Sequence, residues 1–448
     1  MWWDGKITRT FRCKLVQAPG NLGRLLAAIG EQGGLVGEIR IITMGGTAMV
    51  RDITVYADDI RHVDGLVRLI QGLPDVELLE VRDEVLETHQ GGKIAIRSRY
   101  DISSLSVLRR VYTPGVAEVS LKIKDDPSLA RRFTSIRHLV AIVTDGTAVL
   151  GLGDIGPKAA MPVMEGKASL LETLTGLSGM PILLDTKDTE EIIRTVVHIA
   201  PTFGAIQLED ISAPRCFEIE RRIQEAVDIP VMHDDQHGTA VVVTAALLNA
   251  AKIAGVRLAK ARIGVVGLGA AGFALSRMLM SYLDTPVLGA DIVPEAMERL
   301  RAAGGIPSDL KTIMGTADVV IATTGVPGLI KKDMVRKGQI ILALSNPHAE
   351  IEPAAATEAG AAFAADGKSV NNVLGFPGIF RGAVDANVPR ITREMLIAAA
   401  EAIAGFAPAG DIVPNPLDKA LHKTVARAVA RVAVEQGLNR DDLTGYFD

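Results

Sequence analysis

The stretch ARIGVVGLGAAGFALSRML, residues 261–279, decides the fold of the C-terminal half of the chain. A short β-branched strand runs into a G-x-G-x-x-G loop, and an apolar helix follows at once. The first glycine of such a loop allows a tight turn, the second lets a pyrophosphate approach the backbone, and the third lets helix and strand pack closely. The pattern predicts a Rossmann-type dinucleotide site at the positive end of the helix, although a packing turn without cofactor is the alternative. The loop residues are Gly267, Gly269, Ala270, Ala271 and Gly272.

The strands that follow this loop indicate which dinucleotide is bound. TPVLGA, residues 285–290, ends in Asp291, which is placed to accept hydrogen bonds from both ribose hydroxyls of NAD and to repel a 2′-phosphate. The residues just after it include no Arg or Lys, so we expect NAD rather than NADP. GQIILALSNP, residues 338–347, is a further buried strand, and it places Asn346 among the cofactor contacts, although Asn-Pro also marks ordinary turns.

Upstream of the dinucleotide loop, carboxylates follow two short apolar strands. Glu209 and Asp210 end GAIQLED, and Asp234 and Asp235 follow IPVMH. Adjacent carboxylates repel one another unless a cation lies between them, and oxygen-rich sites suit Mg²⁺ or Mn²⁺. Two histidines flank the second pair in HDDQH, residues 233–237. Because carboxylates outnumber imidazoles there, we interpret both as structural hydrogen-bonding groups rather than zinc ligands.

The N-terminal fifth of the chain has a different pattern. From Lys6 to about Val85 it alternates as a small βαββαβ unit, and a polar linker is expected near residues 87–95. Residues 239–256 are predicted to form a long buried helix that leads into the dinucleotide domain. We therefore predict α/β architecture in three domains. These cover residues 1–88, 89–240 and 241–448, the last being the Rossmann domain with its C-terminal helices.

The composition excludes several classes of partner. The net charge of −5 shows no basic excess, so nucleic acid is not expected. No uninterrupted apolar run reaches the roughly 18 residues that span a bilayer, and MWWDGKITRT does not have the pattern of a secretory signal. The two cysteines lie far apart, which argues against a disulfide framework. We expect a cytoplasmic enzyme with no membrane partner.

Seven motifs over residues 97 to about 430 resemble the malic enzymes of the short bacterial branch. They are VYTPGVAEV, TDGTAVLGLGDIGP, MPVMEGKA, QLEDI, HDDQHGTA, LSNP and VNNVLGFPGIFRGA. The resemblance implies oxidative decarboxylation of malate to pyruvate and CO₂ with NAD and a divalent metal, in a homodimer or larger assembly. It also implies a role for each matching residue. Glu209, Asp210 and Asp235 would be metal ligands, Lys167 the general base, Tyr112 the general acid, Asp234 the group that orients Lys167, and Lys167, Asn346 and Asn372 the substrate contacts.

This reaction explains why such residue types are needed. Oxidation requires a base for the C2 hydroxyl, and Lys167 suits this role if burial and the metal depress its pKa. Decarboxylation leaves an enol whose carbon needs a proton, which Tyr112 can donate. Each residue also has a structural alternative. Tyr112 would be a buried aromatic at a turn, Lys167 a surface cation, and the two carboxylate pairs helix caps.

The N-terminal unit resembles the ACT family of regulatory domains, which implies a small-molecule effector. The residues that carry this resemblance lie in the first turn, and they are Pro19, Gly20, Asn21, Leu22, Gly23 and Leu25. The alternative is a packing or dimerisation module without a ligand.

Two further functions remain open at this point. One is a malolactic-type lyase that keeps NADH bound and releases lactate, and the other is a catalytically silent effector-binding protein. The chain also departs from the longer members of the family, because Ala148 stands where those have an Arg that grips the substrate carboxylate. Lys158 is a second unusual residue, with no role that the pattern assigns.

Overall fold

The computed structural model describes residues 6–149, 151–368 and 370–447. The prediction that the N-terminus is not a secretory signal rests partly on the segment MWWDG, which lies outside these residues. The backbone separates into two compact units, Met1–Ala95 and Ile96–Asp448.

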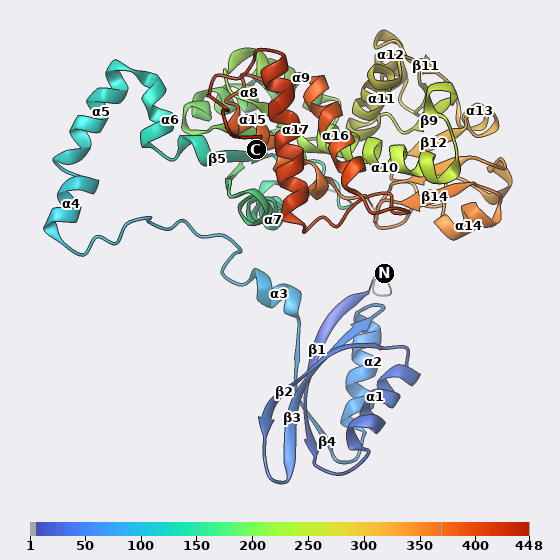
Figure 1. Ribbon diagram of the computed structural model, residues 1–448. Helices are drawn as coiled ribbons and strands as arrows, with labels where there is room; N and C mark the ends of the chain where they lie inside the picture. Colours follow the sequence, from blue (N-terminus) through green and yellow to red (C-terminus); the bar gives the residue numbers. More distant parts are fainter. Residues whose placement is uncertain (1–5, 150, 369, 448) are drawn as a thin grey trace. The chain divides into compact units, whose positions relative to one another are not determined.

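The first unit is a four-stranded antiparallel sheet with two helices on one face (Figure 1). Its elements follow the predicted βαββαβ order, and the strand order is β2-β3-β1-β4. Alternate residues of β1, such as Phe11, pair in register with β3 and are buried against α1 and α2. The elements are β1 (Ile7–Val16), α1 (Asn21–Glu31), β2 (Leu35–Met44), β3 (Ala48–Ala57), α2 (Ile60–Gln71) and β4 (Val76–Arg82).

The segment expected to be a linker begins with a short helix, α3 (Glu84–His89). The carboxylate of Asp83 accepts hydrogen bonds from the backbone N–H groups of Val85 and Leu86, which explains why a helix starts there. Only the residues after α3 are irregular, so the prediction placed the start of the linker too early.

The second unit begins with an exposed arm. Helices α4 (Leu105–Val111) and α5 (Gly115–Asp125) contain no buried residue among those described. Short turns follow at η1 (Pro127–Leu129), α6 (Ala130–Phe133) and η2 (Ile136–His138). Arg131 then anchors the arm, because its guanidinium donates to the carbonyl oxygen of Val384 at 3.0 Å.

A four-stranded parallel sheet follows, in the order β6-β5-β7-β8. Its strands are short, and they are apolar because helices cover them. The core includes Val143, Ile206 and Ile219. The elements are β5 (Leu139–Thr144), α7 (Pro157–Thr175), β6 (Ser178–Leu183), α8 (Thr189–Ile199), η3 (Ala200–Thr202), β7 (Ala205–Leu208), α9 (Arg215–Ala226) and β8 (Val231–His233).

Strand β8 runs through a π-helical turn, η4 (Asp234–Gly238), into the predicted buried helix, α10 (Thr239–Ala254). Among the described residues, the combined helix Asp234–Ala254 is the one long and apolar enough to cross a membrane. However, 67% of its apolar window is buried inside the protein, so it serves as a core helix.

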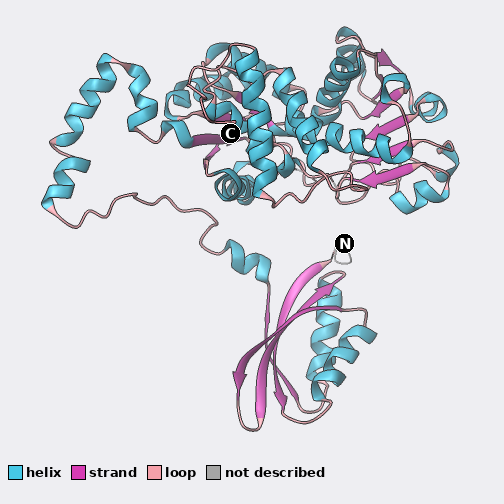
Figure 2. Cartoon of the chain, in the orientation of Figure 1, coloured by secondary structure: helices cyan, strands magenta, loops and turns pink. Residues whose placement is uncertain are grey.

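The glycine loop follows β9, a central strand of a six-stranded, wholly parallel sheet whose order is β11-β10-β9-β12-β13-β14. Renumbered from its first strand, this is the 3-2-1-4-5-6 order of a Rossmann fold. Figure 2 shows this sheet with helices packed around it. The elements are η5 (Leu258–Lys260), β9 (Ile263–Val266), α11 (Ala270–Leu283), β10 (Leu288–Ala290), α12 (Pro294–Ala302), β11 (Ile306–Pro307), α13 (Leu310–Thr316), β12 (Val319–Ala322), η6 (Lys332–Met334), β13 (Ile340–Ala343), α14 (Pro353–Glu358) and β14 (Phe363–Asp366). The chain ends in η7 (Asn372–Leu374), α15 (Phe376–Asp385), α16 (Arg393–Phe406) and α17 (Lys419–Glu435).

Candidate active site

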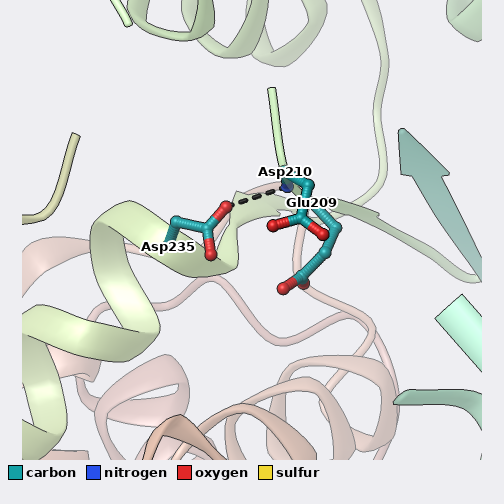
Figure 3. Close-up of side chains that lie close together, drawn as sticks. All are labelled: Glu209, Asp210 and Asp235. Carbon is teal, nitrogen blue, oxygen red and sulfur yellow. Dashed lines mark hydrogen bonds between the residues drawn. The ribbon is translucent and has the colours of Figure 1, made fainter. Parts of the chain in front are cut away.

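The carboxylates gather at the carboxyl ends of β7 and β8, next to the point where the order of the first parallel sheet reverses. Ligands of open α/β sheets bind at such switch points. Glu209, Asp210 and Asp235 each offer an oxygen, and these oxygens all lie within 4.8 Å of one another. Figure 3 shows the three side chains close together, with Asp235 coming from the π-helical turn. The predicted metal ligands are therefore close enough to share one cation.

Local backbone geometry fixes this group of carboxylates. Asp210 has a left-handed backbone, with φ of 53°, and its N–H donates to Oδ2 of Asp235 at 2.8 Å. Gln207 donates from Nε2 to Glu209 Oε2 at 2.6 Å, which fixes the orientation of that carboxylate. Oδ2 of Asp210 is buried and has no hydrogen-bond partner among the described residues. A buried, unpaired oxygen beside two further carboxylates fits a divalent cation.

Burial and mutual repulsion raise the pKa values of these acids. The pKa of Asp210 is raised to about 9, by burial first and then by the charges of Asp235 and Glu209. The pKa of Asp235 is raised to about 6, chiefly by burial. Burial likewise raises the pKa of Glu209. Bringing these acids together therefore costs free energy, which a bound cation would recover.

Lys167 lies against the same cluster. Its side chain comes from α7, and the residue is only 8% exposed, so it is not a surface cation. Its Nζ lies 2.5 Å from Asp234 Oδ2 and 3.0 Å from Glu209 Oε1. The ring of Phe376 covers it, with the centroid 4.6 Å from Nζ. The structure therefore brings together the predicted base, its predicted orienting group and one predicted ligand.

The expected depression of the Lys167 pKa is not found in the chain by itself. Burial opposes the ammonium charge, but Asp234, Glu209 and Asp235 together outweigh burial and hold the pKa of Lys167 above its ordinary value. The sequence analysis made burial of Lys167 a condition for its role, and the structure meets that condition. The sequence pattern did not show that three carboxylates would surround it.

Asn372 joins the two parallel sheets at this site. It follows the last strand of the Rossmann sheet, and its Nδ2 donates to Asp234 Oδ2 at 2.8 Å. The carbonyl oxygen of Asn346 lies beside the loop of the TDGTAVLGLGD motif, 3.6 Å from a Cβ built on Gly151. The carboxyl edge of the Rossmann sheet thus adjoins the carboxylate cluster.

The glycine loop has the geometry that the sequence predicts. Gly267 has φ of +90°, and a Cβ there would lie 2.7 Å from the carbonyl oxygen of Thr323. A Cβ on Gly272 would lie 1.9 Å from the carbonyl oxygen of Gly267, whereas one on Gly269 would meet nothing within 4 Å. The open side at the second glycine, where α11 begins at Ala270 and Ala271, is where a pyrophosphate fits.

Asp291 directly follows β10 and contacts this loop. Its Oδ2 accepts the N–H of Leu268 at 2.6 Å, and its Oδ1 accepts the N–H of Val293 at 2.9 Å. The carboxylate therefore lies beside the glycine turn, as the sequence predicts.

Tyr112 is not part of the cluster in a single chain. It lies in the exposed arm at the end of α4 and is 67% exposed, which excludes the buried-aromatic alternative. Lys158, the unusual residue of its motif, lies at the first turn of α7 and is also exposed.

Four buried or partly buried residues near the site were missed by the sequence reasoning. Asp145 and Thr147, beside Ala148, both accept hydrogen bonds from Arg215 Nη2, at 2.6 and 2.8 Å. Glu350 is fully buried and accepts the N–H of Thr324 at 2.7 Å. The TDGT motif was the available signal for the first pair, whereas nothing in the sequence marked Arg215 or Glu350.

The two histidines differ in their contacts. His237 Nε2 lies 2.9 Å from Glu220 Oε2, as the interpretation of a structural hydrogen bond requires. The backbone N–H of His233 donates to the other oxygen of Glu220 at 2.8 Å, but its fully buried ring has no hydrogen-bond partner among the described residues.

A Rossmann sheet beside a buried lysine and a carboxylate cluster is the arrangement expected of a nicotinamide-dependent dehydrogenase that uses a divalent cation. Residues 99–224 match the model of the malic enzyme N-terminal domain. The chain is 55% identical to NAD-dependent malic enzyme 1 of Bacillus subtilis over 428 residues, 95% of this chain and 98% of that protein. It is 41% identical to a bifunctional malic/malolactic enzyme of the same organism, over 81% of this chain and 95% of that protein. The crystal structure of malic enzyme from Pyrococcus horikoshii superposes with a TM-score of 0.76 at 38% identity, covering 81% of this chain and 92% of that one.

The chain belongs to the malic enzyme family. The 428 residues aligned with the first Bacillus relative are more than residues 96–448 contain, so that alignment extends into the N-terminal unit.

Proposed function

We propose that the chain oxidises malate with NAD to pyruvate and CO₂, using Mg²⁺ or Mn²⁺. The observation that carries this proposal is the contact of Lys167 and Asn372 with one oxygen of Asp234, because it joins a candidate base to the edge of the Rossmann sheet. Membership of the malic enzyme family, with relatives named as NAD-dependent, supports the choice of reaction and cofactor.

We assign the cation to Glu209, Asp210 and Asp235. Three hard oxygen donors with mutually raised pKa values, one of them carrying an unpaired buried oxygen, fit a small divalent ion. When bound, Mg²⁺ or Mn²⁺ polarises the substrate oxygen and stabilises the negative charge left by decarboxylation. Gln207 fixes Glu209, and the N–H of Asp210 fixes Asp235, so the chain holds these donors in place beforehand.

Lys167 is positioned to take the proton of the C2 hydroxyl once a cation on the neighbouring carboxylates offsets the negative charge that holds its pKa above the ordinary value. Asp234 holds its Nζ, and Asn372 holds the same Asp234 oxygen, so the amine has a fixed direction. Phe376 covers the amine and limits the access of water. The glycine loop and Asp291 would hold NAD, which would supply the acceptor for the hydride of C2. Asn346 follows β13 at the same sheet edge, and we assign it contacts with both the substrate and the cofactor.

Tyr112 acts as general acid if a second copy of the chain supplies it. The arm that carries it exposes the apolar side chains of Leu105, Leu121 and Tyr112 itself, which a monomer leaves in water. In a homodimer, each arm would lie on the other chain, and these apolar side chains would be buried. Tyr112 would then reach the active site of the other chain, where a general acid is missing. This assigns the arm both an assembly role and a catalytic one.

A malolactic reaction is the second candidate function. One relative, 41% identical, is named a bifunctional malic/malolactic enzyme. The two reactions separate in one experiment, in which the full chain is given malate, NAD and Mn²⁺ while NADH absorbance, pyruvate and lactate are measured. Rising NADH with pyruvate is the expected result. Lactate without free NADH would replace the proposed oxidation with the lyase reaction.

The N-terminal unit is assigned to regulation as an ACT-type domain. Its fold is a four-stranded antiparallel sheet with two helices, and its buried Asn21 ties the start of α1 to β1 by donating to the carbonyl oxygen of Val16 at 2.9 Å. The exposed Pro19 and Gly20 precede this anchor, so a small effector has access to the turn. We retain a regulatory, a catalytic and a Rossmann domain, and a cytoplasmic location, as parts of this proposal. The second boundary stays at residue 240, and the first moves from residue 88, which lies within α3, to the break between Ala95 and Ile96.

A further inference from the structure

A cavity adjoins the turn that carries Asp235. It has a volume of about 580 Å³ and lies among α9, α10, α11 and α16. Gln236 and His237 of the turn line it, but the three metal-site carboxylates, the loop glycines and Asp291 do not. The cavity is thus separate from both parts of the proposed active site.

The charges around this cavity are unbalanced. The two acidic residues that line the cavity already have partners. Glu220 contacts His237, and Glu218 accepts a hydrogen bond from Arg222. Arg277 and Arg393 both line the cavity, and among the described residues neither forms an ion pair, although the Arg277 guanidinium lies 6.0 Å from the ring centroid of Phe273. Burial and the charge of Arg393 lower the pKa of Arg277. The charge of Glu220 acts in the opposite direction on Arg277, but its two oxygens already contact His233 and His237, so the two neighbouring guanidinium groups still favour an anion between them.

A third donor points to the same space. Gln236 is only 4% exposed, and its buried amide nitrogen has no hydrogen-bond partner among the described residues. Unpaired buried donors are uncommon because each costs free energy, so this one marks a place for an acceptor. Phe217 and Phe273 form an apolar wall beside it, with ring centroids 5.3 Å apart.

We propose that this cavity binds a small anion, a carboxylate or phosphate, through Arg277, Arg393 and Gln236, and that its occupancy changes the affinity of the metal site. The apolar wall favours a ligand whose charged group is attached to an apolar body.

The connection to the metal site runs through two neighbouring residues of one turn. Gln236 follows Asp235 directly, so an anion that holds the amide of Gln236 restricts the turn that positions the Asp235 carboxylate. A second connection passes from His237 to Glu220, which also accepts the N–H of His233 at the end of β8. Binding at one site must then alter affinity at the other by the same factor.

The experiment is a calorimetric titration of the full chain, in the absence of malate and NAD. The two probes are inorganic phosphate and benzoate. The double variant Arg277→Gln/Arg393→Gln should bind the preferred probe roughly ten- to hundredfold more weakly, the loss expected for charge-assisted hydrogen bonds. Arg221→Gln is the matched control, because Arg221 lines the same cavity but is paired with Glu225. The stronger of the two probes identifies whether the site takes phosphate or a carboxylate with an apolar body.

The coupling is measured separately, as Mn²⁺ affinity by electron paramagnetic resonance with and without saturating anion. We expect a change of roughly fivefold or more in the wild-type chain and none in the double variant. Normal Mn²⁺ binding by that variant without anion shows that it is folded. Equal anion binding by wild type and double variant, or binding of neither probe, would overturn the site. Anion binding without any change in Mn²⁺ affinity would overturn the coupling. This part rests on the proposed metal site, whereas anion binding does not, so the two failures are distinguishable.

Discussion

One oxygen of Asp234 lies 2.5 Å from Nζ of Lys167 and 2.8 Å from Nδ2 of Asn372. Lys167 comes from a helix of the first parallel sheet, and Asn372 follows the last strand of the second. A single buried carboxylate thus fixes the position of the candidate base relative to the sheet that is predicted to hold the nicotinamide. Asp234 is therefore a positioning residue, and Lys167 is the group whose loss should affect chemistry most directly.

Replacing Lys167 by Ala should reduce the turnover of malate by roughly two to four powers of ten, the range for a positioned acid-base group. Binding of NAD should change little, because the glycine loop does not contact Lys167. The measurement is steady-state NADH formation together with a fluorescence titration of NAD. Lys158→Ala provides the control, since Lys158 lies on the same helix but is exposed. Near-normal turnover in Lys167→Ala would remove Lys167 from the role of base.

Much of this site was predictable because its signals are local. The glycine loop determines a turn over six consecutive residues, and Asp291 lies at a fixed distance beyond it, so both were found from spacing. Glu209 and Asp235 were recognised because each follows a short apolar strand, and parallel strands end at the same edge of a sheet.

The remaining features depend on contacts between distant segments. The raised pKa of Lys167 comes from carboxylates that are distant in sequence, of which Glu209, 42 positions away, is the nearest along the chain. No local pattern predicts how close these carboxylates come to the Lys167 amine in space. Asn372 was assigned to the substrate by resemblance, whereas its bond to Asp234 spans 138 positions. Tyr112 belongs to an arm whose two helices contain no buried residue among those described, so neither the motif nor the single chain places its side chain in the site.

Replacing Asp235 by Asn should weaken Mn²⁺ binding by roughly a hundredfold, because the variant loses one of three charged oxygen donors. Electron paramagnetic resonance of free Mn²⁺ measures this directly, without substrate. The same titration on Asp154→Asn, an exposed acid of the same unit, should be unchanged. If Asp235→Asn kept wild-type affinity, the cation would have to lie elsewhere.

Replacing Asp291 by Ser together with Ile292→Arg should relax the preference for NAD. The double variant removes the carboxylate that repels a 2′-phosphate, and it adds a guanidinium at a position that is 99% exposed. We expect the ratio of kcat/KM for NAD to that for NADP to fall by roughly tenfold or more, since each 1.4 kcal/mol is a factor of ten. Ile292→Ala alone should leave this ratio near its wild-type value. An unaltered ratio in the double variant would show that selectivity lies outside Asp291.

Deleting residues 1–95 should preserve basal activity and abolish the response to an effector. The cut follows the boundary of the compact unit rather than residue 88, which lies within α3. Basal turnover should persist because the N-terminal unit has its own hydrophobic core, around Phe11, Leu25 and Leu66. The assay compares full-length and truncated chains across a panel of amino acids and acyl-CoA compounds. A metabolite that acts equally on both chains would locate its site outside the N-terminal unit.

Mixing two inactive variants tests whether a partner chain supplies Tyr112. Tyr112→Phe and Lys167→Ala should each be nearly inactive, yet their random mixed dimers should recover about a quarter of wild-type turnover, since half the dimers are hybrids and each hybrid has one complete site. Recovery requires that Tyr112 of one copy act with Lys167 of the other. If the tyrosine served its own chain, no hybrid would contain a complete pair and the mixture would stay inactive. Lys167→Ala mixed with Asp235→Asn is the matched control. Both residues lie in one cluster within a single chain, so this mixture should recover nothing, and activity there would indicate simple additive background.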